Sequence, residues 1–135
     1  MNTPHAPAAV GPYSQAVVDG TRVYTSGQIP LDPATGKLVS GDITAQTRRV
    51  MDNLRAVLEA AGSGLHLISK TTLYVTDLRE FAAINQTYGS YFTSDPPARS
   101  TVQVAALPLG ASIEIEAVAS VAAPASPRDP GSTVR

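Results

Sequence analysis

The segment over residues 112–122 constrains the fold most, because its residues alternate strictly in character. The apolar set shares one face of a strand: Ile113, Ile115, Ala117, Ala119 and Val121. The other face holds Glu114, Glu116, Val118 and Ser120. Such a strand belongs in a sheet that is covered on one side. The chain must therefore supply helices for the apolar face.

Two amphipathic segments can supply that cover. In the first, apolar residues recur at helical spacing: Val50, Leu54, Val57, Leu58 and Ala61. Asp42 is the expected N-cap of this helix, and Gly62 is its expected stop. The second helix follows Asp77 and Glu80, which have the spacing of an acidic capping box. Its apolar face consists of Phe81, Ile84, Tyr88, Tyr91 and Phe92.

The remaining patterned segments are predicted as strands, with the turn Asp19-Gly20 joining the first two. In chain order they cover residues 13–18, 22–29, 37–39, 68–75, 98–106 and 112–122. The order βββαβαββ predicts an α+β fold, with both helices on one face of a five- or six-stranded sheet. The other face would carry Val18, Val23 and Val118 among polar residues. We expect an oligomer to bury this face.

Length and composition restrict the class further. With 135 residues the chain fits one domain, which we expect over residues 1–122. Residues 123–135 are rich in proline and are predicted to form a disordered tail. No stretch approaches the roughly 18 apolar residues of a membrane span, and the start lacks the pattern of a signal peptide. A cytoplasmic protein without a membrane partner is expected.

The inventory of reactive side chains excludes several site types. Cysteine is absent and there are only 2 histidines, so disulfides, thiolate zinc sites and multi-histidine metal sites are excluded. The net charge of −1 implies no general basic surface for nucleic acid. His66 and the group Arg48, Arg49 and Arg55 are interpreted as solvated side chains.

Arg99, Glu114 and Glu116 form the first candidate constellation. If Ala106 pairs with Ala111, both glutamates share a sheet face with Arg99, whereas a slip of one residue separates them. An arginine fork can bind a carboxylate with two hydrogen bonds, and a glutamate can activate water. The alternative is a solvated cross-strand salt bridge of little energetic value.

Two weaker candidates accompany it. Asn85 lies on the apolar side of the second helix, where its amide could orient a ligand or satisfy buried backbone groups. Tyr13 could place a phenol at the mouth of a pocket. Ser26 and the backbone of Gly27 could offer hydrogen bonds to a ligand. The alternative for these residues is a strand entry and a bulge.

Five motifs occur in order and give the chain a specific resemblance: APAAVGPYSQAV, YTSGQIPLDPATGKL, MDNLRAVLEAAGSGL, KTTLYVTDLREFAAIN and PPARSTVQVAALPLGASIEIEAVA. Together they resemble the reactive intermediate deaminase (RidA/YjgF) family over residues 6–121. The resemblance implies a chorismate-mutase-like fold assembled as a homotrimer, with active sites in the clefts between subunits. It also implies hydrolysis of 2-imino acids, or their 2-aminoacrylate-type enamines, to 2-keto acids and ammonia. These reactive intermediates are released by enzymes that use pyridoxal phosphate. The deaminase itself would need no cofactor or metal.

Site residues follow from the same resemblance. Arg99 resembles the family's carboxylate-binding arginine, and Glu114 resembles its water-activating residue. Tyr13, Ser26, Gly27 and Asn85 match pocket positions. Thr101 stands where cysteine is frequent, at a position that assists through its backbone N–H. The connection between Tyr91 and Ala98 looks shorter than usual and lacks an aromatic residue.

Two other function classes stay open. One is a trimer that binds small metabolites or proteins without turnover. The other is an endoribonuclease-like translation inhibitor. The net charge of −1 and the lack of basic residues interleaved with aromatic ones argue against nucleic acid as a partner.

Overall fold

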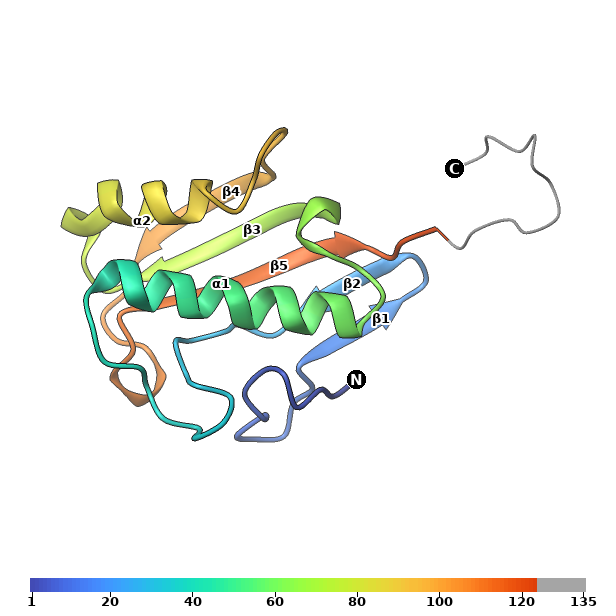
Figure 1. Cartoon of the computed structure of the whole chain (residues 1–135), viewed down its shortest axis with the longest axis horizontal. Coiled ribbons are helices and arrows are strands. Elements are labelled where there is room, and N and C mark those ends of the chain that lie inside the picture. Colours follow the sequence, from blue (N-terminus) through green and yellow to red (C-terminus); the bar gives the residue numbers. More distant parts are fainter. Residues whose placement is uncertain (124–135) are drawn as a thin grey trace, which may run out of the picture.

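The computed structural model describes residues 1–123 and shows a five-stranded mixed sheet with two helices on one side (Figure 1). The elements are, in chain order, β1 (Ala16–Asp19), β2 (Arg22–Thr25), α1 (Ile43–Ala60), β3 (Ile68–Val75), α2 (Phe81–Gly89), β4 (Ala98–Gln103) and β5 (Ile113–Ser120). The strands lie in the order β1-β2-β5-β3-β4. Only β3 and β4 run parallel to each other. None of the described helices is both long and apolar enough to span a membrane.

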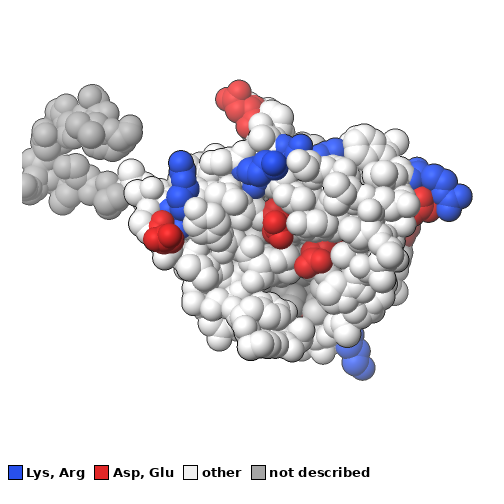
Figure 2. All heavy atoms as spheres, turned by 180° about the vertical axis from the view of Figure 1, so that it is seen from behind, with Lys and Arg blue, Asp and Glu red and all other residues white. Residues whose placement is uncertain are grey.

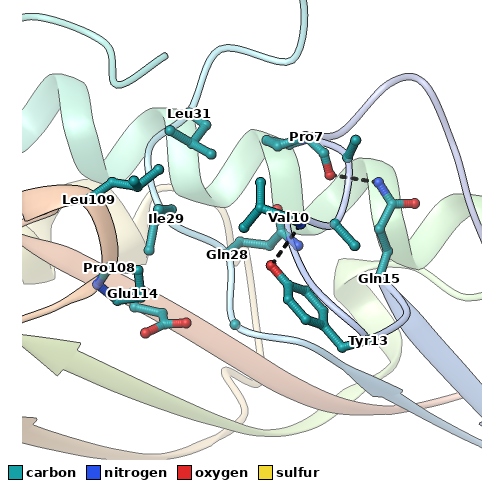
Figure 3. Close-up of a pocket in the computed structure, with 13 residues that line it drawn as sticks. Pro7, Val10, Tyr13, Gln15, Gln28, Ile29, Leu31, Pro108, Leu109 and Glu114 are labelled. Atoms are coloured by element: carbon teal, nitrogen blue, oxygen red, sulfur yellow. Dashed lines mark hydrogen bonds between the residues drawn. The ribbon is translucent and has the colours of Figure 1, made fainter. Parts of the chain in front are cut away.

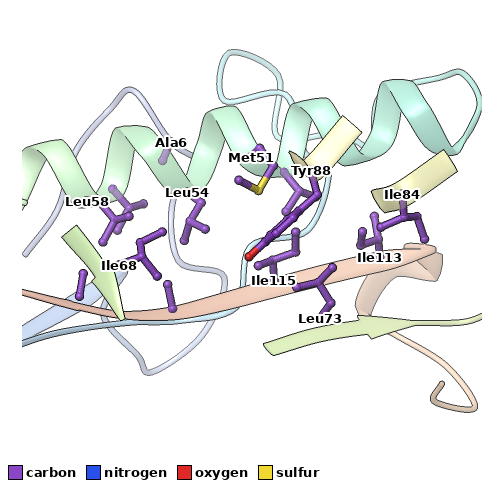
Figure 4. Close-up of a cluster of buried hydrophobic side chains, with 14 of the residues drawn as sticks. Ala6, Met51, Leu54, Leu58, Ile68, Leu73, Ile84, Tyr88, Ile113 and Ile115 are labelled. Atoms are coloured by element: carbon purple, nitrogen blue, oxygen red, sulfur yellow. The ribbon is translucent and has the colours of Figure 1, made fainter. Parts of the chain in front are cut away.

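Helix α1 and the sheet enclose the core (Figure 4). The Asp42 carboxylate accepts a hydrogen bond from the backbone N–H of Ala45 at 3.0 Å, which confirms the expected N-cap. The stripe of α1 is buried against the alternating face of β5, whose Ile113 and Ile115 are fully buried. α2 closes the other end of the core with Ile84 and Tyr88. The described core consequently lies on one face of the sheet.

Two local predictions were wrong. The segment 37–39 forms no strand, because only an isolated bridge between Leu31 and Leu38 pairs this loop. Asp77 caps a short 3₁₀ turn, Leu78–Glu80, by accepting from the N–H of Arg79, and it does not cap α2 itself. The element order is therefore ββαβαββ.

The prediction that β4 and β5 are neighbours was also wrong. β3 lies between them: it pairs parallel with β4, placing Thr71 opposite Arg99, and antiparallel with β5. Consecutive strands are adjacent in most proteins, and the prediction relied on that tendency. Here the chain crosses the end of β3 and joins two strands that are not neighbours in the sheet.

Within residues 1–123, no helix covers the other face of the sheet, which is called the open face below. Figure 2 shows it as a mostly uncharged surface with acidic side chains near its middle. Val17, Tyr24 and Val102 are 54%, 47% and 43% exposed. Val118 lies on this face as expected. Val23 does not, because it is fully buried in the core. Val18 pairs with Val23 across β1 and β2 and therefore also lies on the helix side of the sheet. Side chains of this size left in water are consistent with an interface between copies.

Candidate active site

Glu114 leaves β5 on the open face and lies directly against Gly27. An isolated bridge joins the two segments, since Gln28 and Ile115 exchange backbone hydrogen bonds of 2.8 and 3.0 Å. A Cβ atom built on Gly27 would overlap the Glu114 carboxylate. The backbone conformation of Gly27 does not require glycine, so the requirement is for space. Close approach of a carboxylate to bare backbone is therefore built into this site.

A cavity of about 60 Å³, open to solvent, adjoins the Glu114 carboxylate (Figure 3). Most of its lining is apolar: Pro7, Ala8, Ala9, Val10, Ile29, Leu31, Pro108 and Leu109. Glu114 is the only charged residue among the described residues that line it. Tyr13 stands at the wall, where its hydroxyl accepts a hydrogen bond from the N–H of Val10 at 3.3 Å.

Residues 7–10 form one wall of this cavity, and a buried side chain anchors the segment to which they belong. The Gln15 amide accepts from the N–H of Thr3 at 2.6 Å and donates to the Pro7 carbonyl at 2.8 Å. Ser26 lies next to Gly27, and its hydroxyl donates to the Ser14 carbonyl. The Ser26 hydroxyl proton is thus engaged within the chain, which leaves its oxygen as an acceptor.

The electrostatic environment suits Glu114 to proton transfer. Burial raises the pKa of the Glu114 carboxyl above its ordinary value, and the charge of nearby Glu116 raises this pKa further. Both effects disfavour the ionised form. A carboxyl tuned in this direction exchanges protons closer to neutral pH than an ordinary glutamate does.

Arg99 lies on the opposite face, beneath helix α2. Its Nη2 atom donates a hydrogen bond of 2.7 Å to Oδ1 of Asn85. The central guanidinium carbon is 5.4 Å from the centroid of the Phe81 ring and 5.0 Å from that of Tyr88. The Asn85 amide oxygen therefore accepts a hydrogen bond from a side chain. The sequence analysis had offered buried backbone groups as the alternative partners of this amide.

Thr101 shares the sheet face of Arg99, two residues along β4. Its hydroxyl oxygen is buried and has no hydrogen-bond partner among the described residues. The N–H of Val104 donates to the Val75 carbonyl at 2.8 Å, so the alternation along β4 turns the N–H of Thr101 away from β3. β4 is the edge strand, and this N–H therefore points out of the sheet.

The structure separates the two groups that the sequence analysis placed together. Glu114 and Glu116 share the open face, whereas Arg99 and Thr101 lie on the helix face one strand beyond β3. The expected constellation on a single face was wrong, because it assumed the pairing of β4 with β5. The solvated salt bridge was wrong as well: the ion pairs found among residues 1–123 are Arg55–Asp52 and Arg79–Asp77.

The sequence analysis missed two residues around Arg99 and the apolar wall of the cavity beside Glu114. Phe81 and Tyr88 were interpreted only as an apolar helix face, although both rings lie at the Arg99 guanidinium. Their spacing with Asn85 already put all three on one row of the helix. The apolar cavity wall gave no local signal, because it joins segments far apart in sequence. His66 and Arg48 are exposed, as interpreted.

Comparison with known proteins gives consistent matches. The family model described as Endoribonuclease L-PSP matches residues 3–121. Protein DfrA of Myxococcus xanthus is 54% identical and aligns over 88% of this chain and 92% of its own length. The 2-iminobutanoate/2-iminopropanoate deaminase of Salmonella typhimurium is 52% identical, over 87% of this chain and 93% of its own.

A solved structure agrees with these matches. The crystal structure of E. coli TdcF with bound serine has a TM-score of 0.86 and 43% identity, and it covers 90% of this chain and 98% of its own. The likeness thus extends over nearly all of the described residues in both sequence and fold. The chain belongs to the RidA/YjgF family, the family whose model is described as Endoribonuclease L-PSP.

Proposed function

We propose that the protein is a hydrolytic deaminase that converts 2-imino acids, or their enamine tautomers, to 2-keto acids and ammonia. Each active site would be shared between two copies in a homotrimer. One copy contributes Glu114 and the cavity beside Gly27, with Tyr13 and Ser26 at its wall. The other contributes Arg99 with Asn85 and the outward N–H of Thr101.

The observation that carries this proposal is the placement of Glu114. It is the single charged group among the described residues of an otherwise largely apolar cavity, and burial raises its pKa. Arg99 cannot join it within one copy, because the sheet lies between them. A closed ring of copies resolves this, since it covers the open face and brings unlike edges of neighbouring subunits together.

Arg99 would bind the substrate carboxylate. A guanidinium group has five N–H donors, and the hydrogen bond to Asn85 uses one of them. The others can form the planar fork that matches a carboxylate. The N–H of Thr101, two residues away at the strand edge, can donate to the same anion.

Glu114 would then direct the hydrolysis. Its carboxylate accepts a proton from a water molecule while the water oxygen bonds to the carbon of the protonated imine, and the π electrons of the C=N bond move to nitrogen. The resulting carbinolamine carries hydroxyl and amino groups on one carbon. Transfer of the proton from Glu114 to nitrogen lets ammonia leave, and the regenerated Glu114 carboxylate accepts the hydroxyl proton as the C=O group forms. A protonated imine is already electrophilic, so most of the acceleration would come from positioning the reactants.

Arg99→Lys is the sharpest test of this function. The assay generates imines with an amino-acid oxidase and measures their hydrolysis. Lysine keeps the charge but loses the two-donor fork. Charge-assisted hydrogen bonds are worth roughly 1.5–3 kcal/mol each, so activity should fall about tenfold to a hundredfold. The melting temperature should hardly change.

Arg55→Lys is the matched control. Arg55 also lies over an aromatic ring, Tyr91 at 5.6 Å, and pairs with Asp52, but on the solvated side of α1. The Arg55→Lys variant should therefore retain wild-type activity. Full activity in Arg99→Lys would remove the carboxylate fork from the mechanism.

A second candidate is a trimer that binds an amino or keto acid without turnover. The bound serine in E. coli TdcF favours this candidate, because that relative holds an amino acid. The same preparation separates the two functions. Binding of 2-oxobutanoate without accelerated release of ammonia would support the binding protein and contradict the deaminase.

A further inference from the structure

Helix α2 presents three side chains to the Arg99 guanidinium. Phe81, Asn85 and Tyr88 follow one another at spacings of four and three residues, so they lie on one face of the helix. The guanidinium carbon is 5.4 Å from the Phe81 ring centroid and 5.0 Å from that of Tyr88. Both distances lie within the roughly 6 Å over which an aromatic ring attracts a cation.

The two rings are supported differently. Tyr88 is buried, and its hydroxyl shares a 2.7 Å hydrogen bond with the hydroxyl of Thr71, the residue paired with Arg99 across the sheet. Its ring also packs against Phe92, with centroids 5.0 Å apart. Phe81 is 40% exposed at the start of α2. Core packing therefore explains the position of the Tyr88 ring. It does not fully explain the position of the Phe81 ring, which is partly in solvent.

We propose that Phe81 is a positioning residue for Arg99, acting together with the fixed ring of Tyr88. The rings attract the guanidinium through their π faces, whereas a carboxylate binds through N–H groups in the guanidinium plane. Phe81 can therefore restrict the orientation of Arg99 without occupying the donors that the ligand needs. Holding the fork in its bound orientation lowers the entropy that carboxylate binding costs.

This inference rests on the proposed function, because it assigns a carboxylate ligand to Arg99. It is tested in Phe81→Leu, which removes the ring and keeps an apolar side chain. The Kd for 2-oxobutanoate and the KM for the imine should both rise about two- to fivefold, the range expected for a cation–π contact at an exposed site. The kcat and the melting temperature should stay close to wild type, because Phe81 does not touch the reacting atoms. Phe81→Tyr keeps a π face and should restore both constants.

Leu78→Ala provides the control. Leu78 is 41% exposed in the turn that precedes α2, and its side chain should leave both constants unchanged when shortened. An unchanged Kd and KM in Phe81→Leu, beside a large loss in Arg99→Lys, would overturn the inference and leave the proposed function standing. Equal weakening in Leu78→Ala, or no rescue by Phe81→Tyr, would also overturn it. Wild-type behaviour of Arg99→Lys would instead refute the proposed function.

Discussion

Gly27 is constrained by a neighbouring side chain, and this gives the first prediction at the residue scale. In Gly27→Ala the new methyl group would overlap the Cγ, Cδ and Oε2 atoms of Glu114. The carboxylate must then move out of its place beside the cavity. We expect most deaminase activity to be lost, as in Glu114→Gln, whose amide cannot accept a proton from water. Overpacking should also lower the unfolding free energy by about 1–3 kcal/mol.

The matched control for this prediction is Gly89→Ala. A Cβ atom on Gly89 meets nothing within 4 Å, and the residue ends helix α2. Alanine should be neutral there or should stabilise the helix by up to about 1 kcal/mol. Activity and melting curves measured side by side check both expectations. Wild-type activity in Gly27→Ala would show that the observed contact is not needed for catalysis.

The pair of glutamates gives a prediction on pH dependence. Burial first, and then the charge of Glu116, raise the pKa of the Glu114 carboxyl. Glu114 must be ionised to accept a proton, so kcat/KM should fall as the pH drops through that pKa. Glu116→Gln removes the repelling charge, lowers the pKa of Glu114 and should move the acidic limb of the profile to lower pH.

Glu59→Gln, on the exposed side of α1, is the control for a general effect of net charge. Its acidic limb should stay where the wild-type limb lies. Because the imine substrate is the same in all three proteins, its own titration cannot produce a difference between them. A limb that does not move in Glu116→Gln would contradict the assignment of this limb to Glu114.

At the scale of elements, the beginning of α1 is set by one side chain. Asp42 accepts the N–H of Ala45 at 3.0 Å and is exposed, so its replacement by alanine removes little besides the cap. Asp42→Ala should lower the unfolding free energy by about 1 kcal/mol, while Asp42→Asn should retain most of it because asparagine also caps well. Denaturation at one fixed protein concentration measures both. Equal stability of the alanine variant would exclude a capping role.

Elements governed by local chemistry were predictable from the sequence. The N-cap at Asp42 and the strand Ile68–Val75 agree with the structure. The alternation in β5 correctly predicted that Ile113 and Ile115 are buried. The alternation rule assigns residues to faces without reference to the rest of the fold.

Strand order could not be derived in this way. Alternation places Arg99 and Thr101 on one face of β4, but it does not say which strand lies beside β4 or which face looks toward the helices. That choice depends on β3 pairing on both sides, which is a long-range property. The prediction of a short edge strand over 37–39 was wrong for a related reason, since the only strand-like pairing of this segment is the bridge between Leu31 and Leu38.

At the scale of the whole molecule, the separation of the two site halves becomes informative. A glutamate in a cavity on the open face and an arginine beneath α2 cannot act on one small substrate within a single copy. The open face, with Val17, Tyr24 and Val102 exposed, offers apolar area that an interface between copies would cover. The proposed assembly into a closed ring would account for both features at once. The requirement for a second copy is therefore the central claim.

Subunit mixing tests this claim directly. Arg99→Ala and Glu114→Gln, each expected to be inactive alone, are unfolded, mixed in equal amounts and refolded. Native mass spectrometry verifies that mixed assemblies form. If every site takes Arg99 from one copy and Glu114 from another, random assembly leaves about a quarter of the sites intact. We predict that the mixture regains about that share of wild-type deaminase activity, while each variant refolded alone regains none. Mixed assemblies that stay as inactive as the separate variants would contradict the shared site.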